Sequence, residues 1–261
     1  MSITVQNLSF AYGEKPVLRN VSFALGSGRL LAVLGSNGAG KTTLFRCILG
    51  LQRHYGGTIL LDGVDASALG ARELAQTAAY IPQTQSGGMG YTVLDMALMG
   101  AASGLPVLRT PGQKERERAM GALARLGVER LAYKGYDSIS GGERQLVLIA
   151  RALAQRAKIL LMDEPTASLD YGNQSLVLSA VRALARQGCT VALSTHNPQH
   201  ALWYADAVLA LSGGKTAAFG SPAETVTPAL MKELYGVEAA LVQTEYGPLL
   251  APALVGGQGH A

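Results

Sequence analysis

The feature that most constrains this chain is the segment GSNGAGKT, residues 35–42, which lies between a strand-like and a helix-like stretch. The run RLLAVL before it is short and almost continuously apolar, as in a parallel strand covered on both faces. The residues Leu44, Cys47, Ile48 and Leu51 recur after it at the spacing of one helix face. The sequence therefore predicts a strand, a glycine-rich loop and a helix that begins at the loop.

The composition of this loop is typical of a phosphate-binding site. Gly35, Gly38 and Gly40 permit positive φ angles, so successive backbone N–H groups can surround an anion at the positive end of the helix. Lys41 adds a mobile charge for the outer phosphates and Thr42 a hydroxyl for magnesium, which completes the pattern G-x-x-x-x-G-K-[ST]. A coincidental glycine-rich turn is the alternative, and the matching strand and helix disfavour it.

Composition narrows the class of protein. The 261 residues are 48% hydrophobic and 15% charged, which fits one large globular domain or a domain with a subdomain. Charge or glycine interrupts the apolar stretches before the roughly 18 to 20 residues of a spanning helix, and no signal peptide is visible, so we expect a cytosolic chain. Cys47 and Cys189 are expected to be buried free thiols. The net charge of +4 is not clustered, so we expect no nucleic-acid partner.

The rest of the chain alternates between helical and strand patterns. Residues 3–10 and 21–25 alternate loosely, which predicts an N-terminal antiparallel β subdomain. Residues 91–139 are helical in character and predict an inserted α-helical subdomain. Buried strands at 159–162 and 191–195 each follow an amphipathic helix. The predicted fold class is therefore α/β: a P-loop NTPase core whose mostly parallel sheet is wrapped by helices.

Polar side chains follow the predicted strands, at the edge where a parallel sheet binds its ligands. Asp163 can hold magnesium, usually through water, and Glu164 can polarise a water that attacks the γ-phosphate. A surface pair that begins a turn before Pro165 is the alternative, and the neighbouring phosphate loop disfavours it. His196 ends the next strand and can contact the γ-phosphate or steady the water, although a lone histidine is more often structural. The Gln83 amide can reach both magnesium and water.

A second candidate for anion binding is the segment Ser140-Gly141-Gly142-Glu143, which precedes a strongly patterned helix. It can be a plain helix cap, or it can offer a serine hydroxyl and bare backbone amides to a phosphate. The chain then has one phosphate loop and two anion-binding helix starts. This imbalance predicts that a partner chain completes the site.

Together these residues resemble the ATP-binding subunit of ABC transporters. GSNGAGKT is similar to the Walker A loop, ILLMDE to the Walker B strand and SGGER to the signature, with Glu143 where glutamine is commoner. By the same resemblance, Gln83 is the Q-loop glutamine, His196 the switch histidine, Tyr12 the aromatic that stacks on adenine, and Ser168-Leu169-Asp170 the D-loop. The similarity covers about residues 1 to 220, in the family's order.

The resemblance implies two subunits that enclose two ATP molecules with Mg²⁺, each between one chain's Walker A loop and the other's signature. The implied catalytic residues are Lys41, Gln83, Glu164 and His196, and the implied magnesium ligands are Thr42, Gln83 and Asp163. The implied ATP-binding residues are Tyr12, Gly35, Ser36, Asn37, Gly38, Ala39, Gly40, Lys41, Thr42 and Thr43. Ser140, Gly141, Gly142 and Glu143 are expected to act in trans.

Three further segments, YIPQ, TVLDMALMG and LMKELYGV, are similar to ATPases of bacterial importers for iron-siderophore, haem, cobalamin, molybdate or tungstate. This implies a homodimer attached to two transmembrane permease subunits at the cytoplasmic face of the inner membrane, with a substrate-binding protein reached only indirectly. An exporter with separate chains and a soluble ABC protein acting on ribosomes or DNA are the alternatives. We expect residues 1–246 to form the ATP-binding domain and residues 247–261 a flexible tail.

Overall fold

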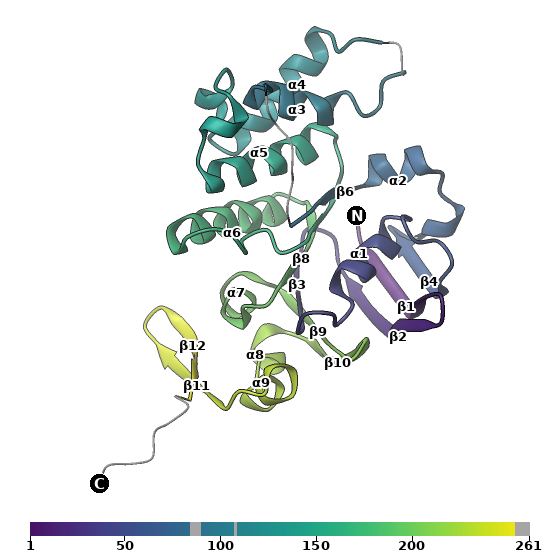
Figure 1. The fold of residues 1–261 in the computed structure, drawn as a ribbon, viewed down its shortest axis with the longest axis vertical. Coiled ribbons are helices and arrows are strands. Elements are labelled where there is room, and N and C mark those ends of the chain that lie inside the picture. Colours follow the sequence, from purple (N-terminus) through teal and green to yellow (C-terminus); the bar gives the residue numbers. More distant parts are fainter. Residues whose placement is uncertain (84–89, 107–108, 254–261) are drawn as a thin grey trace.

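The computed structural model of the protein describes residues 1–83, 90–106 and 109–253. An antiparallel sheet of four strands lies at the N-terminal end of the molecule (Figure 1). Its order is β2 (Lys15–Leu25), β1 (Ile3–Tyr12), β4 (Gly56–Leu61) and β5 (Val64–Asp65). The predicted N-terminal subdomain is therefore confirmed, with strands longer than the alternation indicated.

The central sheet has six strands in the order β10-β9-β3-β8-β7-β6. These strands are β3 (Leu30–Leu34), β6 (Ala78–Ile81), β7 (Ile159–Met162), β8 (Thr190–Thr195), β9 (Ala207–Ser212) and β10 (Lys215–Gly220). All neighbours are parallel except β9 and β10, which form an antiparallel hairpin. The order places β8 between β3 and β7, so their carboxyl ends share one edge.

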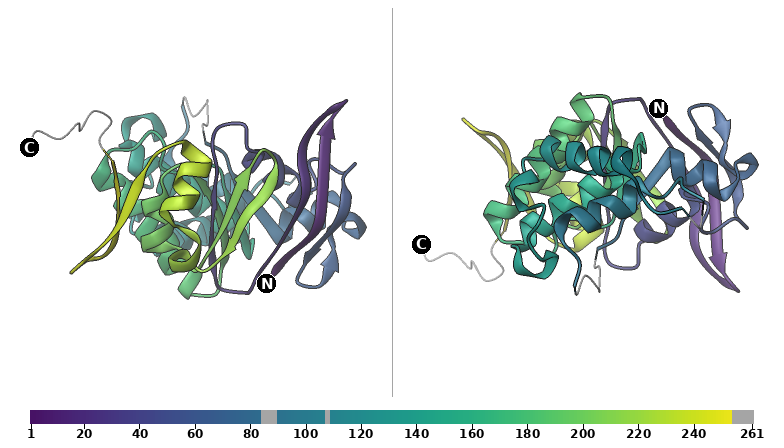
Figure 2. Two further views of the ribbon diagram at one scale, coloured as in Figure 1. Left: turned by 90° about the horizontal axis from the view of Figure 1, so that it is seen from below. Right: turned by 90° about the horizontal axis from the view of Figure 1, so that it is seen from above.

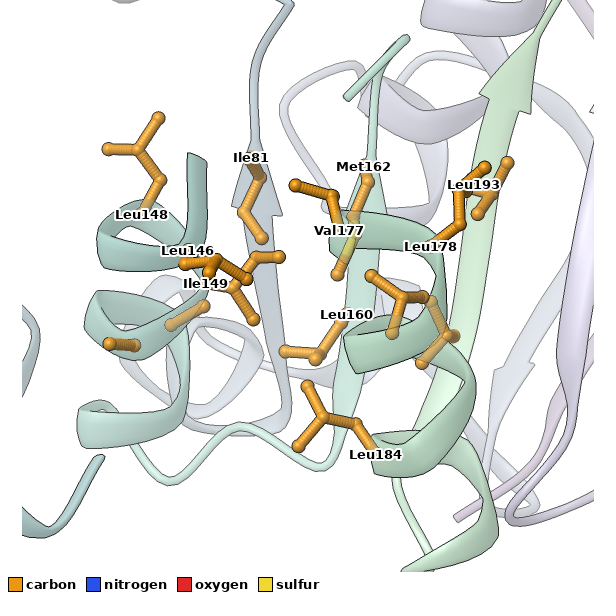
Figure 3. Close-up of a cluster of buried hydrophobic side chains, with 14 of the residues drawn as sticks. Ile81, Leu146, Leu148, Ile149, Leu160, Met162, Val177, Leu178, Leu184 and Leu193 are labelled. Atoms are coloured by element: carbon orange, nitrogen blue, oxygen red, sulfur yellow. The ribbon is translucent and has the colours of Figure 1, made fainter. Parts of the chain in front are cut away.

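Helices cover both faces of this sheet. They are α1 (Lys41–Ile48), α2 (Ala71–Thr77), α5 (Gly141–Ala154), α6 (Tyr171–Arg186), α7 (Pro198–Tyr204), α8 (Pro222–Thr225) and α9 (Pro228–Tyr235). On one face, Leu146 of α5 and Leu184 of α6 meet Leu160 of β7 in a wholly buried cluster (Figure 3). Within the described residues, no helix is long and apolar enough to cross a bilayer.

The helix after the glycine loop is shorter than the apolar spacing predicts. It ends at Ile48, and Leu51, expected on its buried stripe, is 62% exposed. Gly50 adopts a φ of 67°, the left-handed conformation that commonly ends a helix. The apolar spacing therefore predicts the helix correctly but places its C-terminal end too late, because the backbone reverses locally at Gly50.

The expected flexible tail is wrong for residues 247–252. They form β12 (Gly247–Pro252), which pairs with β11 (Ala239–Thr244) in a two-stranded antiparallel hairpin. This hairpin extends from the body away from the N-terminal sheet (Figure 2). The Gln199 side chain of α7 donates to Pro248 O at 2.8 Å and accepts from Leu250 N at 2.9 Å. These contacts lie far apart in sequence, so composition alone misses them, and residues 254–261 lie outside the described residues.

The helical subdomain contains α3 (Val93–Ala101) and α4 (Gln113–Arg125). Thr92 and Asp95 form a capping box at the start of α3. Gly100 brings α3 against α5, because a Cβ at this position would overlap the Arg151 carbonyl oxygen. The subdomain therefore packs on the core through a backbone-to-backbone approach that only glycine allows.

We predict opposite effects for two helical glycines of this subdomain. Gly100→Ala should lower the free energy of unfolding by about 1–3 kcal/mol, because the added methyl forces α3 away from α5. Gly121→Ala in α4 has open space around the new Cβ and should raise stability by up to about 1 kcal/mol. Urea denaturation measures both, and a destabilised Gly121→Ala with an unchanged Gly100→Ala would contradict the packing described.

Candidate nucleotide site

The glycine loop joins the end of β3 to the first residue of α1. Gly38 and Gly40 have φ angles of 80° and 102°, which side chains rarely adopt. Gly35, at φ 155°, also lies so close to β9 that a Cβ would come within 2.6 Å of Leu211 O. The loop amides therefore stand at the N-terminus of a helix whose dipole favours an anion.

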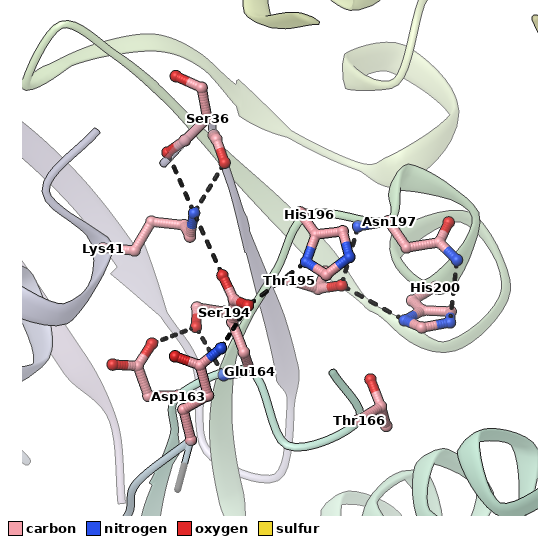
Figure 4. Close-up of polar contacts among 12 residues, drawn as sticks. Ser36, Lys41, Asp163, Glu164, Thr166, Ser194, Thr195, His196, Asn197 and His200 are labelled. Carbon is pink, nitrogen blue, oxygen red and sulfur yellow. Dashed lines mark hydrogen bonds and ion pairs between the residues drawn. The ribbon is translucent and has the colours of Figure 1, made fainter. Parts of the chain in front are cut away.

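Lys41 is 6% exposed, and its ammonium has three partners. Its Nζ donates to Gly35 O at 2.8 Å and to Ser36 O at 3.2 Å, and it lies 3.6 Å from Oε1 of Glu164 (Figure 4). A buried cation is tolerated only with such compensation. Lys41 thus links the loop after β3 to the carboxylate after β7.

Asp163 accepts three hydrogen bonds at the end of β7. The donors are Thr42 Oγ1 at 2.5 Å, Ser194 Oγ at 2.6 Å and Tyr80 Oη at 3.2 Å. Burial raises the pKa of Tyr80 to about 12, and the charge of Asp163 adds to the rise. The Thr42 hydroxyl and the Asp163 carboxylate meet directly, so two oxygen donors of the kind that Mg²⁺ prefers stand together.

Glu164 is held through both its backbone and its carboxylate. Its φ of 46° is unusual for a non-glycine residue, and its N–H donates to Ser194 Oγ at 2.9 Å. Its Oε2 accepts from Gln83 Nε2 at 3.2 Å and lies 3.4 Å from Nδ1 of His196. Such backbone strain costs on the order of 1–3 kcal/mol and is concentrated at functional sites. The structure therefore brings the side chains of Lys41, Gln83, Glu164 and His196 together.

A cleft of about 360 Å³ opens beside these groups. Its described lining is Tyr12, Lys15, Val17, Asn37, Gly38, Ala39, Gly40, Lys41, Thr42, Thr43, Gln83, Asp163 and Glu164. Tyr12, at the end of β1, is exposed and stands edge-on to Phe10 with ring centroids 4.8 Å apart. The cleft thus joins an aromatic at one end to the phosphate loop and paired carboxylates at the other. Of the predicted loop residues, Gly35 and Ser36 contribute the carbonyls that hold Lys41.

The signature segment lies elsewhere on the described surface. Ser140 caps α5 in a capping box with Glu143, and Glu143 also pairs with Arg130 at 3.0 Å. The backbone N–H of Ser140 is the main cause of the lowered pKa of Glu143. Ser140 and Gly141 are exposed, and residues 140–143 are absent from the described lining of the cleft. The predicted second anion site is therefore a separate surface of the chain.

The D-loop residues lead into α6, beside this signature. Asp170 is the N-cap of α6, and Asn173 donates to it through both its backbone and its side chain. Asn173 also covers Gly142, where a Cβ would overlap its side chain, and Leu169 lies over Gly141. Ser168, in the turn before α6, is exposed. The D-loop and the start of α6 therefore pack directly against the signature.

Two residues of the site were not predicted from the sequence. Ser194 is wholly buried in β8 and bonds both Asp163 and the Glu164 backbone. Tyr80 in β6 donates to Asp163. A hydroxyl directly after the apolar run at residues 191–193 of a buried strand was the available signal for Ser194, because a buried polar group needs a partner. The signal for Tyr80 was weaker, since a strand tyrosine is common.

A second histidine lies in α7, the helix that follows His196. His200 in α7 is 9% exposed, with Nδ1 3.3 Å from Thr195 Oγ1 and Nε2 3.1 Å from Asn197 Nδ2. Burial, helped by the charge of His196, lowers its pKa from 6.5 to about 4. His200 therefore remains neutral where it supports the turn that carries His196.

We predict that His200 makes stability depend on pH. Between pH 6.5 and about 4, His200 is protonated in the unfolded chain but stays neutral in the folded chain. The stabilising contribution of His200 is therefore complete above pH 6.5 and is lost as the pH falls toward 4. The loss should reach about 2–3 kcal/mol. Urea titrations at pH 7 and 4.5 measure the free energy of unfolding. This free energy should fall less between the two pH values for His200→Gln than for the wild type or for the exposed control His54→Gln. Equal differences in all three would contradict this assignment.

Comparison with known proteins gives a consistent result. The ABC transporter family model matches residues 18–167. The hemin import ATP-binding protein HmuV of Bordetella pertussis is 36% identical over 248 residues, 92% of this chain and 94% of that protein. A structure described as a metal-chelate type ABC transporter in an inward-facing conformation has a TM-score of 0.84 at 33% identity, covering 97% of this chain and 98% of that one.

A dimeric bacterial ABC transporter cassette has a TM-score of 0.72 at 26% identity, covering 84% of this chain and 98% of that one. The family model spans more than half of this chain, and the hemin import relative spans nearly all of it. The protein therefore belongs to the ABC transporter family, as one of its ATP-binding ATPase subunits.

Proposed function

We propose that this protein hydrolyses ATP to drive a bacterial importer for a metal chelate, such as haem or an iron siderophore, or for a related oxyanion. The observation that carries the proposal is the meeting of Lys41, Asp163, Glu164 and His196 beside one phosphate loop. The relative named for hemin import and the structure of a metal-chelate type transporter support the cargo class.

ATP fits the cleft in one direction. Tyr12 offers an exposed ring on which adenine can stack, and the loop N–H groups can donate to phosphate oxygens at the start of α1. Lys41 would leave the carbonyls of Gly35 and Ser36 for the outer phosphates, which are stronger acceptors. The buried ammonium of Lys41 would therefore be paired with oxygen acceptors both before and after ATP binds.

The oxygen donors of Thr42, Asp163 and Gln83 fit Mg²⁺, which favours hydroxyl, carboxylate and amide oxygens. These three residues would hold the ion, with Asp163 acting through water. Bound magnesium would neutralise phosphate charge and orient the γ-phosphoryl group. The Ser194 and Tyr80 hydroxyls would keep the Asp163 carboxylate in place.

Glu164 is placed to act as the general base. It would accept a proton from the water that attacks the γ-phosphorus, while the bond to the ADP oxygen breaks and phosphate is released. Gln83 and His196 contact the same carboxylate oxygen and would orient the base and the water. The reaction consumes one water and yields ADP and phosphate.

A homodimer would complete each site. Ser140 and Gly141, which begin the signature of this chain, are exposed, and residues 140–143 do not line the described cleft, so this segment is available to the nucleotide of a second copy. The dimeric structure of a related cassette supports this arrangement. A two-fold axis would then pair each phosphate loop with the partner's signature.

Attachment to a membrane would come from two permease subunits at the cytoplasmic face of the inner membrane. The helical subdomain exposes Tyr91, Met99 and Tyr133, which offer apolar surface to such a partner. The subdomain follows Gln83 in the chain, so closure at the nucleotide would be transmitted to it. The substrate-binding protein would be reached only through the permease.

Glu164→Gln should reduce Mg-ATP hydrolysis at least about 100-fold while leaving ATP binding within about twofold, because the amide keeps the shape but not the basicity. Glu245→Gln, at the tip of the C-terminal hairpin, is the matched control and should keep wild-type turnover. Hydrolysis is measured as released phosphate and binding by calorimetry.

The same pair of variants tests direction and cargo in liposomes that contain the co-purifying permease. The wild type, but not Glu164→Gln, should drive ATP-dependent uptake of haem, an iron siderophore or molybdate. Outward transport would favour an exporter, and salt-sensitive nucleic-acid binding without transport would favour a non-transport ATPase.

Mixing two inactive variants tests the dimer. Lys41→Ala damages the phosphate loop and Ser140→Arg the signature, so each homodimer should be inactive. A mixed dimer would keep one site with both parts intact, and an equal mixture should regain up to about a quarter of wild-type activity if the sites are independent. If the phosphate loop and the signature of each site came from the same chain, the mixture would remain inactive.

A further inference from the structure

The side chain of Asn173 connects the D-loop to the signature. Asn173 lies in the first turn of α6, and its Nδ2 donates to Oδ2 of Asp170 at 2.7 Å. Its backbone N–H donates to Oδ1 of the same carboxylate at 2.8 Å. Both oxygens of the Asp170 carboxylate are therefore bonded to Asn173, and this pair of hydrogen bonds fixes the direction of the Asn173 amide.

The other side of this amide lies on Gly142 of the signature. Because Nδ2 faces Asp170, Oδ1 is the amide atom that is left to face the signature. A Cβ on Gly142 would overlap Oδ1 of Asn173 and would lie 2.6 Å from its Cγ. The amide therefore rests directly on the Gly142 backbone, at an approach that only glycine allows.

This contact falls on the end of α5 that can bind an anion. The first N–H groups of a helix have no intrahelical acceptor. Glu143 N–H donates to Ser140 Oγ at 3.2 Å, whereas no described residue accepts a hydrogen bond from the N–H of Gly141 or Gly142. The side chain of Asn173 therefore sets the position of the turn whose N–H groups remain available to a phosphate.

Asn173 stands apart from the nucleotide cleft of its own chain. It is absent from the described lining of that cleft, and so are residues 140–143. An effect of Asn173 on hydrolysis must therefore pass through the signature. In the proposed homodimer the signature meets the nucleotide of the second copy, so Asn173 would influence the partner's site and not its own.

We propose that Asn173 is a positioning residue, which holds the signature in place for the nucleotide bound to a second copy of this chain. Asp170 fixes the amide from one side, and the amide fixes the Gly142 backbone from the other. The D-loop and the signature then approach the second copy as one unit. This inference rests on the proposed homodimer and its ATPase mechanism.

Dimerisation on ATP tests the inference in the Glu164→Gln background, in which ATP is bound but not hydrolysed. Asn173→Ala removes the amide but keeps the backbone N–H that bonds Asp170. ATP binding by each subunit should stay within about twofold, because the phosphate loop is unchanged. The Kd of the ATP-bound dimer should rise about tenfold, because the N–H groups that meet the partner's phosphates are no longer held in place.

Ser179→Ala is the matched control, at an exposed residue of the same helix, and should leave the Kd of the dimer unchanged. Binding is measured by calorimetry and dimerisation by analytical ultracentrifugation. An unchanged Kd for Asn173→Ala would overturn the inference. If Glu164→Gln alone formed no dimer with ATP, the proposed homodimer itself would be wrong.

Heterodimers isolated through two different affinity tags show on which nucleotide Asn173 acts. With Lys41→Ala on one chain and Asn173→Ala on the other, the working site keeps an intact signature. Its turnover should equal that of a heterodimer with Lys41→Ala alone. With both substitutions on one chain, the working phosphate loop faces the altered signature, and turnover should fall about tenfold.

The comparison separates positioning from a general loss of stability, because both heterodimers carry the same two substitutions. Equal turnover in the two would overturn the inference, since a structural defect lowers both alike. If Lys41→Ala on one chain silenced both sites, the Kd of the ATP-bound dimer would decide the question. A wild type that releases no phosphate would instead overturn the proposed ATPase mechanism.

Discussion

The ammonium of Lys41 is the interaction on which the site depends. It is nearly buried, and a buried cation must be paired wherever the chain places it. The carbonyls of Gly35 and Ser36 and the carboxylate of Glu164 supply that compensation from two separate loops. The same charge therefore folds the glycine loop back on itself and links it to the end of β7. A triphosphate is a better partner for this cation than a carbonyl, so binding replaces one set of contacts with another.

The hydroxyl of Ser194 is a second centre of organisation. It donates to Asp163 and accepts from the N–H of Glu164, so one side chain of β8 orients the two adjacent carboxylate residues that follow β7. Glu164 has a left-handed backbone, which the fold tolerates because this hydrogen bond and its side-chain contacts hold it there. The parallel order β3-β8-β7 makes the arrangement possible, since the strand that carries Ser194 lies between the loop and the carboxylates.

The C-terminal segment approaches the same edge from behind. Gln199 bonds the backbone of β12 on one side of α7, and the turn that carries His196 directly precedes that helix. Tyr235 of α9 lines a cavity of about 280 Å³ together with His196. A two-stranded hairpin is only marginally stable alone, so its packing on α7 is what orders it. Motions of this segment and of the switch histidine are therefore expected to be coupled through side chains rather than through the sheet.

The sequence by itself determined the α/β class, the phosphate loop, the strands ending in Asp163 and His196, and the helical insertion, because glycine spacing, apolar periodicity and strand-end polarity are local patterns. Only the tertiary structure decided that Ser194 and Tyr80 lie at this site, since their partners are distant in the chain. It also decided where α1 ends and that residues 247–252 are paired, because a left-handed Gly50 and the hydrogen bonds of Gln199 override periodicity and composition.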